Sequence, residues 1–137
     1  LIRNVMQHCS IFEPGVVELL MISGKNTVDE AVAACFENPA LELLALKNGS
    51  RGCTLFSRSE TVKLGIYPAD VVDPTGAGDC FDGALLCALI EGKSLREAGE
   101  YATAAAGLNT AMFGPMEGKI SRETIAQAMR QPMEMKE

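Results

Sequence analysis

The apolar and polar positions at the start of the chain predict strands and helices that follow one another closely. A short apolar stretch at 9–14 ends at a proline and predicts a strand. The run 15–24 predicts a helix that a glycine ends, with Val17, Leu20 and Met21 on its expected apolar face. The first residues resemble the end of a helix, so we expect the end of a helix, then a strand, and then directly another helix.

The middle of the chain carries a helix-capping signal and the clearest hairpin signal in the sequence. Thr27 and Glu30 have the spacing of a capping box at the start of a second helix. Residues 41–57 contain two apolar runs around the turn sequence NGSRG, which predicts a β-hairpin. A third extended stretch at 61–74 contains a proline, which favours an edge strand or a split strand.

The last part of the chain predicts helices. Between 79 and 92 the apolar positions recur at helical spacing, and they are Phe81, Ala84, Leu85, Ala88 and Leu89. Ser94 and Glu97 form a second capping box before an alanine-rich helix, and a short helix is expected at 121–130. The order of elements predicts an α/β fold with a sheet packed against helices.

Composition excludes several classes of partner. The 137 residues carry a net charge of −6 without a cluster of Lys and Arg, so neither nucleic acid nor an anionic membrane surface is expected as a partner. The sequence shows no apolar run of membrane-spanning length and no signal-peptide pattern, so a cytoplasmic protein is expected. The five cysteines lack metal-binding spacing and are expected to be reduced thiols.

The most informative stretch is a glycine-rich turn directly before the helix at 79–92. Gly76, Ala77 and Gly78 leave the backbone bare where a helix begins, so their N–H groups are candidates to bind an anion. Asp79 follows them, and a negative charge is favourable at this end of a helix. Read alone, the four residues GAGD fit a phosphate site and a simple capped turn about equally well.

The longer string DPTGAGDCFDGALL is very similar to the C-terminal signature of the ribokinase-like, or PfkB, carbohydrate kinase family. The resemblance extends forward through the alanine-rich helix to Gly114 and backward to the segments LALKNGSRGCTLF and FEPGVVELL. It implies the C-terminal part of a three-layer α/β/α fold, with residues 1–137 as the nucleotide-binding portion of a sugar kinase.

The resemblance also implies a reaction, the transfer of the γ-phosphate of ATP to a sugar hydroxyl. In this reaction Asp79 is the general base, and the amides of Gly76, Ala77 and Gly78 stabilise the transferring phosphoryl group. Phosphoryl transfer depends mainly on such positioning and electrostatic stabilisation. A ketose or a sugar acid is the expected substrate, and a nucleoside kinase of the same family remains the alternative.

Further residues match family positions that bind the nucleotide and its metal ions. Glu18 matches the glutamate that orders Mg²⁺ and its waters, although a solvent-facing helix glutamate is the alternative. Asp73 and Thr75 match positions near a monovalent cation such as K⁺. The remaining matches lie on the segment that approaches the nucleotide, where an ordinary hairpin turn is the alternative, and they are Lys47, Gly49 and Gly52.

Two positions depart from the family pattern, and a large part of the family's sequence is absent. Gly15 replaces an asparagine near the magnesium site, and Thr103 replaces an asparagine beside the adenine. Family members are much longer and carry most sugar contacts in their N-terminal portion. We therefore expect the chain alone to be inactive and to associate with itself or with that portion. A non-catalytic fragment that binds a nucleotide or a partner remains a second alternative.

Overall fold

The computed structural model describes residues 2–115, 117 and 119–136. The chain divides into two compact units. The described part of the first unit is residues 2–49 and 53–63, and that of the second is residues 50–52, 64–115, 117 and 119–136. The prediction that 1–137 forms one nucleotide-binding portion stays a prediction.

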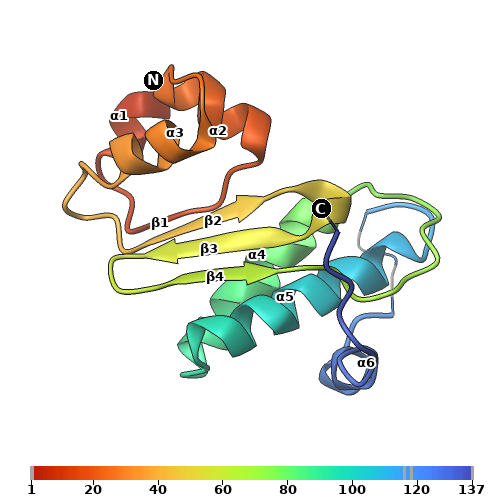
Figure 1. The fold of residues 1–137 in the computed structure, drawn as a ribbon. Helices are drawn as coiled ribbons and strands as arrows, with labels where there is room; N and C mark the ends of the chain where they lie inside the picture. The colour runs from red at the N-terminus through yellow and green to blue at the C-terminus, as the bar shows by residue number, and fades with distance from the viewer. Residues whose placement is uncertain (1, 116, 118, 137) are drawn as a thin grey trace. The chain divides into compact units, whose positions relative to one another are not determined.

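The first unit contains three helices and the strands of a sheet (Figure 1). In chain order its elements are α1 (Ile2–Met6), β1 (Ile11–Phe12), α2 (Val16–Ser23), α3 (Val28–Cys35), β2 (Leu43–Lys47), β3 (Cys53–Ser57) and β4 (Thr61–Leu64), the last residue of which belongs to the second unit. A 3₁₀ turn at Gly49–Arg51 connects β2 to β3. The four strands lie in the order β1-β2-β3-β4.

Strand pairing confirms the predicted hairpin. β2 and β3 are antiparallel, with a register that runs from Leu43 opposite Ser57 to Lys47 opposite Cys53. β1 and β2 are parallel, and the helices α2 and α3 form the connection that a parallel pair requires. The carboxyl ends of β1 and β2 therefore lie at the same edge of the sheet.

The core of the first unit lies between one face of the strands and the helices α2 and α3. Leu44 and Leu46 are two residues apart on β2, so both point to this face, where they pack with Leu19 of α2 and Cys35 of α3. The predicted apolar face of α2 was wrong in two residues, because Val17 and Met21 are 70% and 73% exposed. The turn of the helix instead places Leu19 at the centre of the contact, and its exposure is 0%.

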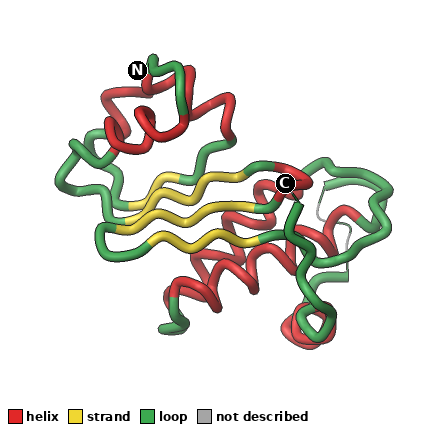
Figure 2. The backbone as a smooth tube through the Cα atoms, in the orientation of Figure 1, coloured by secondary structure: helices red, strands yellow, loops and turns green. Residues whose placement is uncertain are grey.

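The second unit contains α4 (Ala77–Ile90), α5 (Leu95–Thr110) and α6 (Arg122–Ala128), which are drawn as red helices in Figure 2. α4 and α5 are antiparallel neighbours, because a short turn joins the end of α4 to the start of α5. The predicted apolar stripe of α4 is confirmed, with Phe81, Leu85 and Ala88 buried. The small residues of α5 allow close packing, and several of its alanines are at most 1% exposed.

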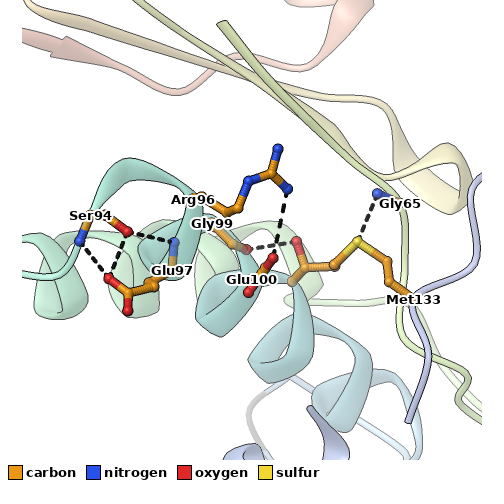
Figure 3. Close-up of polar contacts among 8 residues, drawn as sticks. Gly65, Ser94, Arg96, Glu97, Gly99, Glu100 and Met133 are labelled. Carbon is orange, nitrogen blue, oxygen red and sulfur yellow. Dashed lines mark hydrogen bonds and ion pairs between the residues drawn. The ribbon is translucent and has the colours of Figure 1, made fainter. Parts of the chain in front are cut away.

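Hydrogen bonds fix two parts of this unit, the start of α5 and the C-terminal segment (Figure 3). At the start of α5, the N–H and hydroxyl of Ser94 donate to Oε2 of Glu97 at 2.9 and 2.6 Å, which confirms the predicted capping box. Near the C-terminus, the N–H of Gly65 donates to Sδ of Met133, and Ile66 forms a bridge with Glu134. The C-terminal segment is therefore tied to the chain that leads from β4 to α4.

The helices of the described residues are all too short or too polar to cross a membrane.

Candidate functional site

The glycine turn before α4 has a backbone conformation that only glycine adopts easily. Gly76 is the N-cap of α4, with φ 78° and ψ −2°, in the left-handed region. A Cβ at this position would lie 3.0 Å from Cβ and 3.1 Å from Cα of Pro115. The positive φ angle and the close approach of Pro115 therefore both require glycine at position 76.

The turn leaves several amide groups available at the positive end of the α4 dipole. The first bond of the helix runs from the N–H of Cys80 to the carbonyl of Gly76 at 2.9 Å. Within the described part of the chain, the N–H groups of Gly76, Gly78 and Asp79 have no protein acceptor. The N–H of Ala77 donates to the carbonyl of Pro74 at 3.2 Å. This amide can therefore bind an anion only if its hydrogen is shared between Pro74 and the anion. The arrangement suits a bound anion.

Asp79 is the third residue of α4 and is exposed to solvent. Its carboxylate makes no hydrogen bond or ion pair with any other described residue. Its oxygens are therefore available to accept a proton from a bound hydroxyl group, directly beside the amides of the turn.

Asp73 holds the loop in front of these amides. Its Oδ1 accepts the N–H of Thr75 at 2.9 Å, and its Oδ2 accepts the N–H of Gly114 at 3.0 Å. Hydrogen bonds from the side chain and backbone of Thr75, and then from the backbone of Gly114, lower the pKa of Asp73 below its ordinary value. The carboxylate thus connects the chain before α4 to the chain after α5.

Asn109 is a structural residue of this site that the sequence analysis missed. It lies in the last turn of α5 with an exposure of 0%, and its Nδ2 donates to the carbonyl of Thr75 at 2.9 Å. The Nδ2 atom would also lie 3.6 Å from a Cβ placed on Gly76. The available signal was an amide side chain directly after the run of small and apolar residues 102–108, at the end of the helix that precedes Gly114.

The first unit brings three of the predicted residue positions together at the carboxyl ends of β1 and β2. Gly15 forms a parallel bridge with Lys47, whose N–H donates to the carbonyl of Pro14 at 2.9 Å. Gly15 begins α2, and its N–H donates to Oε2 of Glu18 at 2.7 Å. Glu18 and Lys47, predicted to act on the metal ion and on the nucleotide, thus lie on adjacent elements of this unit.

Glycine is suited to the two positions of the hairpin turn for different structural reasons. Gly49 has φ 54° and is exposed, with open space where a Cβ would be. Gly52 has φ 87° and is buried, and a Cβ there would lie 2.1 Å from the carbonyl oxygen of Leu64. Packing against the end of β4 accounts for Gly52 without a nucleotide, so its predicted role in nucleotide binding stays a prediction.

Thr103 uses its side chain within its own helix. It is 6% exposed, and its hydroxyl donates to the carbonyl of Gly99 at 2.8 Å. This bond satisfies the hydroxyl inside α5, whereas an asparagine at the same position would extend further. The expectation that Thr103 occupies the nucleotide-binding position beside the adenine stays a prediction.

The described residues fit two of the implied cofactor groups. A single exposed carboxylate, Glu18, suits Mg²⁺, which keeps most of its waters and needs few protein ligands. The amides of Gly76 and Gly78 suit a phosphate group. When bound, these groups would supply the phosphoryl donor and the neutralising charge.

Comparisons with known proteins give the same assignment. A family model described as pfkB family carbohydrate kinase matches residues 1–121. A ribokinase from Arabidopsis thaliana is 33% identical, covering 93% of this chain and 35% of the relative. Fructokinase-2 from Solanum lycopersicum is 30% identical, covering 70% of this chain and 29% of the relative.

A solved structure extends the agreement to the fold. A protein described as ribokinase II from E. coli, in complex with ATP and Mg²⁺, matches with a TM-score of 0.90 and 32% identity over 94% of this chain and 42% of that one. The predicted ribokinase-like α/β fold is therefore confirmed. The chain spans about a third of the length of the Arabidopsis ribokinase. On the family match and the fold, this chain belongs to the pfkB family of carbohydrate kinases.

Proposed function

We propose that the chain is the C-terminal, nucleotide-binding portion of an ATP-dependent sugar kinase. The observation that carries the proposal is the start of α4, where Asp79 has no structural partner among the described residues and follows amides without protein acceptors. A group that only capped the helix would be expected to use its carboxylate for a backbone N–H.

In the proposed reaction, Asp79 accepts the proton of a sugar hydroxyl while that oxygen attacks the γ-phosphorus of ATP. The N–H groups of Gly76 and Gly78 stabilise the negative charge on the phosphoryl oxygens, and the bond to the ADP oxygen breaks. In the first unit, Glu18 is the residue that would hold Mg²⁺, and the ion would supply charge neutralisation for the phosphates. Relatives named ribokinase and fructokinase support a small sugar as the substrate, and a ketose or a sugar acid remains our proposal for its type.

The proposal includes a partner for the sheet. β1 has two residues and pairs with β2, and no described strand pairs with its other edge. An unpaired strand edge favours association with another strand. We propose that the N-terminal portion of the kinase fold pairs there, and that the 137-residue chain alone does not phosphorylate sugars.

The test is Asp79→Asn in the intact natural polypeptide that carries these residues. We expect kcat for ATP-dependent phosphorylation of ribose or fructose to fall about 10²- to 10⁴-fold, because the proton acceptor is lost. Binding of Mg-ATP, measured by calorimetry, should not weaken, because the amides remain. The measurement of kcat uses ADP release.

Asp29→Asn is the matched control, because Asp29 is an exposed aspartate in the first turn of α3 and should leave kcat unchanged. Unchanged turnover in Asp79→Asn would remove Asp79 from the reaction. Binding of Mg-ATP without phosphorylation of any sugar would favour the non-catalytic alternative. A folded sample that binds no nucleotide would overturn the proposal.

A further inference from the structure

The carbonyl of Thr75 and the N–H of Gly76 belong to the same peptide unit, at the point where the chain enters the glycine turn. A trans peptide unit is planar, and its carbonyl and N–H point in opposite directions. The described residues contain no cis peptide bond. A contact that fixes the direction of the Thr75 carbonyl therefore also fixes the direction of the Gly76 N–H, one of the amides proposed to stabilise the phosphoryl group.

The side chain of Asn109 in α5 fixes the direction of this carbonyl. Its Nδ2 donates to the Thr75 oxygen at 2.9 Å, and the residue has an exposure of 0%. A hydrogen bond in a buried environment is electrostatically stronger than the same bond in water. The Gly76 N–H consequently points away from Asn109, and it has no acceptor among the described residues.

The peptide group on the other side of Thr75 is also held by a side chain. The N–H of Thr75 donates to Oδ1 of Asp73 at 2.9 Å. Hydrogen bonds thus restrain the peptide units before and after Thr75, directly ahead of Gly76. Glycine has the greatest backbone freedom of all residues, so Gly76 cannot fix the orientation of its own N–H. Contacts from outside the turn have to fix it, and Asn109 provides the contact to this peptide unit.

We propose that Asn109 is a positioning residue for the phosphoryl site, whose amide directs the Gly76 N–H at the γ-phosphoryl group by holding the Thr75 carbonyl. A donor that already has the correct orientation stabilises a developing negative charge better than one that must first reorient. Asn109 acts through the peptide unit, without contact to the nucleotide or the sugar. The inference deepens the proposed function and rests on it for the role of the glycine turn.

The test uses Asn109→Leu in the intact natural polypeptide, because leucine has a similar size but cannot donate a hydrogen bond. We expect kcat for ATP-dependent phosphorylation of ribose or fructose to fall about 10- to 100-fold, and KM for the sugar to change by less than about twofold. Calorimetry then compares Mg-ADP with a nonhydrolysable Mg-ATP analogue. The variant should bind the analogue about tenfold more weakly and Mg-ADP as before, because only the analogue carries a γ-phosphate.

Asn38→Leu is the matched control, since Nδ2 of Asn38 also donates to a backbone carbonyl, that of Met6, at 2.9 Å. This variant should lower the melting temperature but leave kcat and both affinities unchanged. If Asn109→Leu does not fold, Asn109→Ala removes the same donor with a smaller side chain. Equal weakening of both nucleotides, or unchanged kcat and affinities, would overturn this inference alone. An unchanged polypeptide that binds neither nucleotide would overturn the proposed function and this inference with it.

Discussion

Two helices of this protein begin with the same pattern, a glycine at the N-cap followed three residues later by an acid. α2 begins after Gly15 and carries Glu18, whereas α4 begins after Gly76 and carries Asp79. In α2 the acid turns back and accepts the N–H of its own glycine at 2.7 Å. In α4 the corresponding carboxylate makes no such bond.

The backbone of the glycine and the length of the acid explain the difference. Gly15 is extended, with φ −75° and ψ 165°, the conformation in which an N-cap N–H can be bonded by a carboxylate in the first turn. Gly76 is left-handed, with φ 78° and ψ −2°, and aspartate is one methylene shorter than glutamate. The cap geometry available to Glu18 is therefore not available to Asp79.

The comparison shows how an acid at a helix start becomes available for chemistry. Before α4, Asp73 and Asn109 hold the loop from outside the helix, by hydrogen bonds with the N–H and the carbonyl of Thr75. Asp79 does not have to stabilise its own helix by a hydrogen bond. A glycine and an acid at this spacing do not by themselves distinguish a cap from a reactive group.

Substitution of each N-cap glycine by alanine should give the largest difference between the two helix starts, measured as the loss in the free energy of unfolding. We expect Gly76→Ala to lower the free energy of unfolding by about 2–3 kcal/mol, because a left-handed alanine is strained and its Cβ meets Pro115. Gly15→Ala should cost about 0.5–1 kcal/mol, since its backbone is extended and its Cβ would be 3.4 Å from Oε2 of Glu18. Urea unfolding followed by circular dichroism measures both. Equal losses would contradict the difference in backbone geometry.

The hydrogen bonds of the Asp73 carboxylate should make the stability of the chain depend on acid pH. The pKa of Asp73 is lowered in the folded state, so its contribution to stability is present above the unfolded value of about 3.8 and is lost as the pH falls through the folded pKa. We expect the melting temperature to fall more gently below about pH 4 in Asp73→Asn than in the unchanged chain.

Glu97→Gln is the control for this effect, because the pKa of Glu97 is also lowered, first by the side chain of Ser94. This variant should likewise reduce the slope below the ordinary glutamate pKa. The backbone amide resonance of Gly114 should move only in Asp73→Asn, because that N–H donates to Asp73. An unmoved Gly114 resonance in Asp73→Asn would argue against the loop contact.

The smallest expected effect comes from Gly15→Asn, which introduces the residue that the family carries there. We expect a change of less than about 0.5 kcal/mol in the free energy of unfolding, because asparagine and glycine are both accepted at an N-cap. If the first unit helps to bind Mg-ATP, one new hydrogen bond should tighten binding by about two- to tenfold in calorimetry. An equal gain in Gly15→Ala would show that the amide group is not its cause.

Much of the local structure could be predicted from the sequence because its signals act over a few residues. The hairpin at 41–57, the capping box of Ser94 and Glu97 and the buried stripe of α4 are all present in the structure. The apolar face of α2 could not be predicted, because Val17 and Leu19 are both apolar and only packing against β2 selects Leu19.

The sequence by itself determined the family, the order of elements and the position of Asp79, because the motif and the caps are contiguous in the chain. Only the tertiary structure decided which groups support the site. The bond from Asn109 to Thr75 joins residues 34 apart, and the bond from Gly114 to Asp73 joins residues 41 apart. Such contacts form only when the end of α5 packs beside the start of α4, and no local pattern encodes that packing.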